Sequence, residues 1–358
     1  MTESKENGLL TGYMPALDCM RGFAILLVLL HHVKYRFPGF AVDPFTEFIS
    51  RIGWAGVDLF FAISGYLITS ILLRSDGKLA PFFIKRVFRI IPLYIVAVVV
   101  YLILGEIRGF SDVENIWIPL LLLTGWVAPF VDNERIPYLI TWSISVEESA
   151  YIFFGLVSKF GSTLFVPFLW VLVVAGVMLR WVLVANNIFE VQHVYYFPPT
   201  RIDSIAIGGL MFVYASRWRP KVRILEWLVL ISFFIVFWLG RDGQYNHTVA
   251  ILGYTVFSVM AALWVVYLAD VRQLSNPVLR ALAYIGRRSY FFYLFHVFLI
   301  GIFGLGAFSG VVNGLGFWGV VSSVTIVTLI LGEISWRFFE SPMIKFGRRL
   351  AAITASDT

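Results

Sequence analysis

Long apolar segments separated by short polar stretches run through almost the whole chain. A membrane-spanning helix needs about 20 largely apolar residues. Ten segments fit this description, and we expect a transmembrane helix in each: 16–35, 54–73, 90–106, 139–158, 163–184, 200–216, 224–240, 248–269, 288–306 and 316–338. The pattern therefore predicts an all-α polytopic membrane protein, a bundle of about ten transmembrane helices.

One further apolar segment, 115–130, is short and contains Pro119 and Pro129. Loops rich in Lys and Arg belong on the cytoplasmic side of a membrane. Four groups of basic residues mark such loops: 74–89, 217–223, 272–288 and 345–349. If 115–130 crossed the bilayer, the loops on its two sides could not both be external. We therefore interpret it as a re-entrant or interfacial segment, which leaves ten crossings and both termini in the cytoplasm.

This topology predicts three parts: a cytoplasmic tail at 1–15, a transmembrane domain at 16–340 and a basic cytoplasmic tail at 341–358. The N-terminus has no apolar run followed by a cleavage site of small residues, so we expect no removable signal peptide.

Composition supports the membrane interpretation. Of the 358 residues, 59% are hydrophobic and only 14% are charged, against about 25% charged in soluble domains. The net charge of +6 is explained by basic cytoplasmic loops, so we expect membrane lipids and no nucleic acid as partners. The single cysteine, Cys19, excludes an intramolecular disulfide and a cysteine-type zinc cluster, and we expect no metal.

Ionisable residues inside apolar segments are energetically costly and usually mark a site or a pathway. The first predicted span carries Asp18 and Arg21 at its cytoplasmic end, and His31 and His32 near its outer end. Arg21 and His32 are eleven residues apart, which puts them on one face of a helix about 16 Å apart. Each alone is explained by anchoring at the membrane interface, but the shared face favours a functional pair.

Two later spans also carry polar groups. Glu147 and Glu148 are adjacent and point to different sides of a helix, so we expect one of them to face the bundle interior. Ser289, Tyr293 and His296 recur at intervals of four and three residues along one face. Structural hydrogen bonding explains this stripe about as well as chemistry does.

Charged residues near the ends of other spans admit structural explanations. Arg201 and Asp203 lie near the outer surface, where an interfacial salt bridge between them would explain both. Asp58 lies near the outer end of the second span, where we expect it to be buried. Glu340, at the inner end of the last span, has Arg337 as a possible partner.

Arg86 and Arg89 stand immediately before the predicted third span and share a helical face. One interpretation is an ordinary basic flank of a membrane helix. The other is a phosphate-binding fork, because guanidinium groups present paired donors that match phosphate oxygens.

Seven sequence motifs occur in an order that is specific to one family: LDCMRG followed by His32, GVDLFFAISGYL, KRVFRIIPLY, WSISVEE, PTRID, SYFFYLFH and FFESP. With these motifs the chain resembles the acyltransferase type 3 family over essentially its whole length. These are integral-membrane O-acyltransferases that modify carbohydrates outside the cytoplasm. Where this chain has His31-His32, the family more often has Phe-His. We expect no hydrolase-like domain after the bundle, although some relatives have one.

The resemblance implies roles for particular residues. His32 is implied to be the catalytic histidine with Arg21 as its companion, and Arg86 and Arg89 are implied to hold the phosphates of acyl-CoA. Other motif positions are assigned to the acyl-CoA site: Glu340, Ser289, Tyr293 and His296. Asp58, Arg201 and Asp203 are assigned to the carbohydrate acceptor. The family further implies acetyl-CoA or another acyl-CoA as co-substrate, a carbohydrate or glycolipid acceptor, and the bacterial inner membrane.

The layout permits a mechanism in which acyl-CoA enters from the cytoplasm and carries its thioester up to His32. His32 would act as general base on the acceptor hydroxyl, with Glu147 fixing its tautomer; covalent transfer through the histidine is an alternative. The competing function is a proton-coupled transporter or flippase of a glycan or lipid-linked sugar, because Arg, His and Glu also build proton relays. No inverted repeat with paired broken helices supports that function.

Overall fold

A computed structural model describes residues 14–75, 79–108, 112–218, 245–305 and 308–356, together with isolated positions between 227 and 238. Within these residues every regular element is a helix. The predicted span at 224–240 falls largely outside the described residues, as do Arg219, Lys221 and Arg223 of the second basic group.

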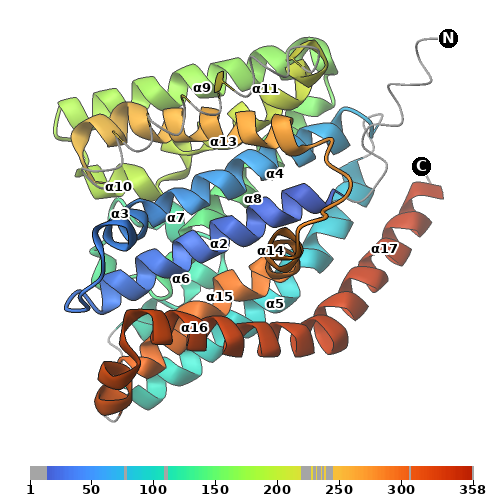
Figure 1. The fold of residues 1–358 in the computed structure, drawn as a ribbon. Helices are drawn as coiled ribbons and strands as arrows, with labels where there is room; N and C mark the ends of the chain where they lie inside the picture. Colours follow the sequence, from blue (N-terminus) through green and yellow to red (C-terminus); the bar gives the residue numbers. More distant parts are fainter. Residues whose placement is uncertain are drawn as a thin grey trace.

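The longer helices form the bundle in Figure 1: α2 (Pro15–Arg36), α4 (Gly56–Leu72), α5 (Leu79–Arg108), α8 (Trp142–Ser158), α9 (Ser162–Ala185), α11 (Ile202–Trp218), α13 (Tyr254–Leu268), α15 (Ser289–Phe303) and α16 (Ser309–Ser335). Shorter helices connect or flank them: α3 (Pro44–Ile52), α6 (Trp117–Leu120), α7 (Thr124–Val127), α10 (Val191–Tyr196), α14 (Pro277–Arg287) and α17 (Ser341–Ser356). Helix α2 begins and helix α17 ends at the right-hand end of the bundle (Figure 1).

Every predicted span other than 224–240 overlaps a helix, which confirms the all-α class. In the part of the chain that the structure describes, six helical stretches are long and apolar enough to cross a membrane: Pro15–Arg36, Pro44–Leu72, Leu79–Arg108, Ser162–Ala185, Val249–Leu268 and Ser309–Ala355. Two shorter apolar helices, Ile202–Ala215 and Ser289–Phe303, accompany them. The chain is thus an integral membrane protein, while the number of ten crossings stays a prediction.

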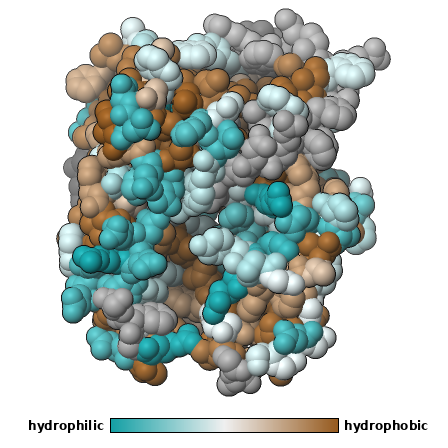
Figure 2. Space-filling view, turned by 90° about the vertical axis from the view of Figure 1, so that its left-hand side faces the viewer, coloured by the Kyte–Doolittle hydropathy of each residue, from teal (hydrophilic) through white to brown (hydrophobic). Residues whose placement is uncertain are grey.

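The left-hand end of the bundle, where α3 and α10 lie, faces the viewer in Figure 2. Hydrophilic side chains are frequent across this face, and hydrophobic ones appear toward its edges. A polar end of this kind is expected where a membrane bundle meets water, because exposed polar groups are costly in the lipid interior.

The segment 115–130 does not form one continuous helix. It contains only the single turns α6 and α7, separated at Leu122, whose φ of 59° lies in the left-handed region. The Tyr94 hydroxyl of α5 donates to the Pro119 carbonyl at 2.7 Å, so the segment is held against the bundle. This agrees with a segment that does not span the bilayer, and its re-entrant position stays a prediction.

One predicted boundary is wrong. Helix α5 begins at Leu79, eleven residues before the predicted start at 90, so Arg86 and Arg89 lie inside a helix and do not precede it. Pro81 falls in the first turn, where a missing N–H costs nothing. Residues 341–356 of the predicted tail form α17, which continues from α16 through a π-helical turn at Trp336–Glu340, and the cytoplasmic position of this tail stays a prediction.

Glycines set the closest approach between helices. A Cβ atom built on Gly286 of α14 would lie 1.8 Å from the Asp18 carbonyl oxygen of α2. A Cβ atom on Gly65 of α4 would lie 1.8 Å from the Ile205 carbonyl oxygen of α11. No side chain fits at such distances, so backbone packs directly against backbone at both crossings, as is common between membrane helices.

We predict that Gly286→Ala destabilises the protein, because its methyl group must push α14 away from the turn of α2 that carries Asp18 and Arg21. Overpacking of this kind costs about 1–3 kcal/mol. A thermal unfolding scan of the detergent-purified protein should show a lower midpoint. Gly301→Ala in α15 is the matched control, because a Cβ atom there meets nothing within 4 Å. Equal midpoints for the two variants would contradict the packing argument.

Candidate active site

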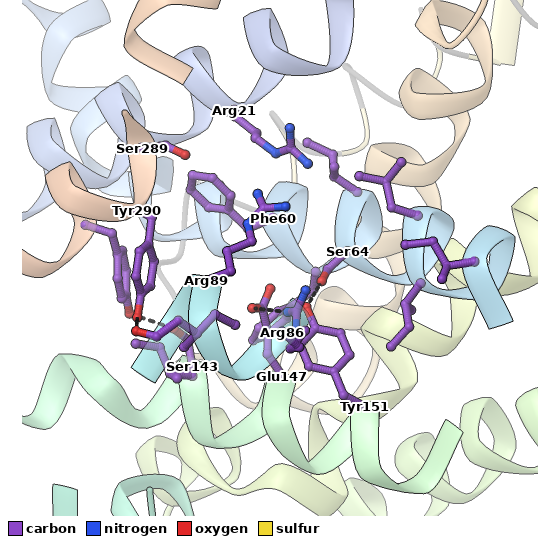
Figure 3. A pocket seen from close by; sticks show the side chains of 18 of the residues that line it. Arg21, Phe60, Ser64, Arg86, Arg89, Ser143, Glu147, Tyr151, Ser289 and Tyr290 are labelled. Atoms are coloured by element: carbon purple, nitrogen blue, oxygen red, sulfur yellow. Dashed lines mark hydrogen bonds and ion pairs between the residues drawn. The ribbon is translucent and has the colours of Figure 1, made fainter. Parts of the chain in front are cut away.

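A cavity of about 350 Å³ opens between α2, α4, α5, α8 and α15 (Figure 3). Six residues singled out from the sequence line it: Arg21, Arg86, Arg89, Glu147, Ser289 and Tyr293. They come from four different helices, so the fold brings together side chains that are far apart in the chain. The rest of the lining is largely apolar, and Phe60 stands between the arginines in Figure 3.

Arg86 is held between acidic and aromatic groups. Its Nη2 atom lies 3.5 Å from Glu147 Oε2, and its Nε atom lies 3.7 Å from Glu148 Oε1. Its guanidinium carbon lies 3.2 Å from the centre of the Tyr151 ring, a cation–π contact. Both carboxylates therefore turn toward one cation, whereas we expected them to face different sides. Tyr151 was missed in the sequence, although it follows Glu147 by four residues on the same helical face.

The other two arginines have different surroundings. Arg21 forms an ion pair with Asp18 one turn earlier in α2, at 2.7 Å. Arg89 is exposed to the cavity, and no hydrogen bond or ion pair joins it to another described residue. The donors of Arg89 are thus available to an anion, whereas the charge of Arg86 is already balanced.

His32 lies beside His296 and not beside Glu147. The Nδ1 atom of His32 is 2.8 Å from the Val28 carbonyl oxygen and 3.3 Å from Nε2 of His296. The neighbouring His31 turns toward α3, with its Nδ1 atom 3.0 Å from the Ser50 carbonyl oxygen. Glu147, which we expected to orient His32, contacts Arg86 instead.

The cavity lining does not include the two histidines, but along α15 it comes within one helical turn of His296. Tyr293 lines it and precedes His296 by three residues in α15. Val57 of α4 also lines it, next to Gly56, which contacts α2 at Ala24 and Val28. His32 is not among the lining residues. The Tyr293 hydroxyl is hydrogen-bonded to Ser143 at 2.7 Å, and both residues line the cavity.

The residues assigned to the acceptor form a buried network outside this cavity. Arg201 pairs with Asp58 at 2.7 Å, and Asp203 pairs with Arg180 at 2.9 Å. The predicted salt bridge between Arg201 and Asp203 at the surface is wrong, since both side chains are fully buried and bind other partners. Arg180 was missed, although a lone arginine in an apolar span was a signal for it. Acceptor binding by Asp58, Arg201 and Asp203 stays a prediction.

Glu340 also differs from the expectation. It accepts a hydrogen bond from Ser335 at 3.0 Å, whereas Arg337 pairs with Glu333 at 2.6 Å. Arg288 binds the same Glu333 carboxylate at 2.6 Å. Glu340 does not line the cavity, and its assignment to acyl-CoA stays a prediction. Among the described residues no group of three or more His, Cys, Asp or Glu side chains is placed to hold a metal ion.

Comparison with known proteins gives a consistent result. A family model described as an acyltransferase domain matches residues 14–336. O-acetyltransferase OatA of Staphylococcus aureus is 27% identical to the chain, over 94% of the chain and 58% of OatA. A Bacillus subtilis protein named "Putative peptidoglycan O-acetyltransferase YrhL" is also 27% identical, over 94% of the chain and 56% of its own length. The chain thus spans little more than half the length of these relatives.

No solved structure is significantly similar to the chain. The names of these relatives lend no support to the transporter alternative. The family match covers most of the chain and contains the cavity arginines, Glu147 and both histidines of the pair. The chain belongs to the acyltransferase type 3 family.

Proposed function

We propose that the protein is a membrane O-acyltransferase. It moves an acyl group, in the simplest case acetyl, from acyl-CoA to a hydroxyl group of a carbohydrate outside the cytoplasm. The observation that carries the proposal is the layout of α2. This helix presents Arg21 to a cavity that also holds the unpaired Arg89, and His32 lies three turns further along.

The cationic end of the cavity suits the phosphates of CoA. Arg89 has free donors, and Arg21 faces the same space (Figure 3). Arg86 contacts two carboxylates through two of its nitrogens, whereas Arg21 pairs with one carboxylate, Asp18, through Nη1. We therefore assign phosphate binding to Arg89 and Arg21 and a supporting role to Arg86. Charge-assisted hydrogen bonds from guanidinium to phosphate are among the strongest that proteins make.

The histidine end suits proton transfer. Because a carbonyl can only accept, the Nδ1 atom of His32 donates to Val28 and its Nε2 atom carries the lone pair. Nε2 takes the proton from the acceptor hydroxyl while the hydroxyl oxygen attacks the thioester carbonyl. A C–O bond forms, the C–S bond breaks, and the CoA thiolate recovers the proton. To reach His32 the thioester must pass Tyr293, which lines the cavity.

The acceptor class rests on the relatives. One is named for peptidoglycan O-acetylation, and we propose a cell-envelope glycan as acceptor for this chain. We also propose the bacterial inner membrane as its location, since the donor is cytoplasmic and the acceptor is not. The positions of the basic loops support cytoplasmic termini.

The direct test is release of CoA. The detergent-purified protein is incubated with acetyl-CoA and soluble peptidoglycan fragments or other envelope oligosaccharides, and free thiol and acetylated sugar are measured. We expect thiol release that depends on the acceptor and matches sugar acetylation. A transporter or flippase cannot produce this result, and absence of acetyl transfer to every envelope glycan tested would refute the proposal.

We predict that His32→Ala lowers kcat by about 10²–10⁴-fold, the usual contribution of a general base. His31→Ala is the matched control, because His31 faces the Ser50 carbonyl and not the His296 ring. Chromatographic profile and melting temperature should show that both variants are folded. Near-normal turnover of His32→Ala would exclude His32 as the base.

We predict that Arg89→Ala raises KM for acetyl-CoA about tenfold or more, as expected when a charge-assisted hydrogen bond worth 1.5–3 kcal/mol is lost. The effect on kcat should be smaller. Arg280→Ala, an exposed arginine of α14 outside the cavity, removes the same charge and serves as the control. If both variants change KM equally, Arg89 is not a phosphate ligand.

A further inference from the structure

The second histidine of the pair has no role in the mechanism above. His296 is fully buried in α15, and its ring centre lies 5.0 Å from that of His32. We propose that His296 is the positioning residue of His32: it accepts the Nδ1 proton of His32, so that the two rings act as a pair that holds a single extra proton during acyl transfer. This inference rests on the proposed function, in which His32 is the base.

Backbone carbonyls assign the tautomer of His296. Its Nδ1 atom lies 2.9 Å from the Phe292 carbonyl oxygen and 2.8 Å from the Tyr293 carbonyl oxygen. Since both of these atoms are acceptors, Nδ1 carries the hydrogen and Nε2 keeps its lone pair. A neutral His296 therefore presents an acceptor, and not a donor, to its neighbour.

The tautomer of His32 is complementary. Its Nδ1 atom lies near the Val28 carbonyl oxygen and therefore carries the hydrogen, which also faces the His296 Nε2 lone pair at 3.3 Å. One N–H and one lone pair thus meet between the rings. The outer nitrogen of His32, Nε2, stays free to act as the base.

No carboxylate is available for this task. Among the described residues no ion pair joins either ring to Asp or Glu, and Glu147 and Glu148 both turn toward Arg86. His31, the other nearby imidazole, turns to the Ser50 carbonyl. The Nδ1 bonds to the two carbonyls would be enough for a histidine with a purely structural role. His296 also uses its Nε2 atom, which contacts His32.

The proton balance is simple. When Nε2 of His32 takes the hydroxyl proton, the ring becomes an imidazolium. Its Nδ1 proton is then shared with, or passes to, Nε2 of His296, and the positive charge is stabilised by the Phe292 and Tyr293 carbonyls. A neutral ring here fills the position that an aspartate fills in a hydrolase triad. The proton returns by the same route when the CoA thiolate leaves, so no other reactant is needed.

The test compares three variants in the acetyl-transfer assay. His296→Phe keeps a ring but removes the acceptor, and we expect kcat to fall about 10²-fold while KM for acetyl-CoA changes little. His296→Gln offers a carbonyl oxygen to His32 Nδ1 and should recover part of kcat. Leu294→Ala is the control for packing, because this fully buried residue lies two positions away, on nearly the opposite side of α15.

If His296 is only structural, His296→Phe should lose stability without a specific loss of kcat per folded molecule, as Leu294→Ala should. That result would overturn the inference and leave His32 as base. A second readout does not depend on activity. The chain has five histidines, so ¹⁵N spectra of the imidazole rings can be assigned by single substitutions. We expect Nδ1–H on both His32 and His296, and Nε2–H on either ring would refute the pairing even where acetyl transfer is intact.

Absence of acetyl transfer in the unmodified protein would instead overturn the proposed function, and the ring spectra would still decide whether the two histidines pair as inferred.

Discussion

A charge buried in a membrane protein needs a partner, and this requirement organises the interior of the bundle. Arg201 has Asp58, Arg180 has Asp203, and Arg86 has two glutamates. Each of these cations is balanced by the protein itself, and the attraction within each pair offsets the cost of taking the charges out of water. Arg89 differs from them, because it faces a cavity and has no ion-pair partner among the described residues. The position of this charge is the reason for our proposal that the cavity binds an anion.

Helix α2 carries both Arg21, which lines the cavity, and His32, which lies beside His296. Its first turn packs against α14 at Gly286, and its middle turns pack against α4 at Gly56. Direct backbone contact leaves the helix little freedom to slide or rotate. Arg21 and His32 are therefore held in a fixed relation by one rigid element, and the other helices supply the groups around each of them. A shift of α2 at one of these glycine contacts would therefore displace Arg21 and His32 together.

Much of the fold and part of the site follow from the sequence alone. Apolar segments predict the helices because length and composition decide membrane insertion. The helical period correctly puts Arg21, Ser289 and Tyr293 toward a common interior. The apolar pattern and the helical period do not predict which residues of different helices contact each other. Asp58 finds Arg201, 143 residues later, and His32 finds His296, 264 residues later. Such partners depend on how the helices are rotated and staggered, which no local pattern reveals. The early start of α5 was missed because its first turns are basic and resemble a loop.

The fixed span of α2 has a consequence for donor selection. In the proposed reaction the phosphates of CoA bind near Arg21 and the thioester carbon reacts near His32. The rise of helix α2 fixes the distance between these two residues at about 16 Å. The helix therefore fixes the distance that the arm of CoA must reach, and this arm is the same in every acyl-CoA. Discrimination between short and long acyl chains must therefore come from the room left beyond the imidazole, on the side where the sugar arrives. In this proposal, a change in the transferred acyl group requires changes around the imidazole of His32 and none at Arg21 or Arg89.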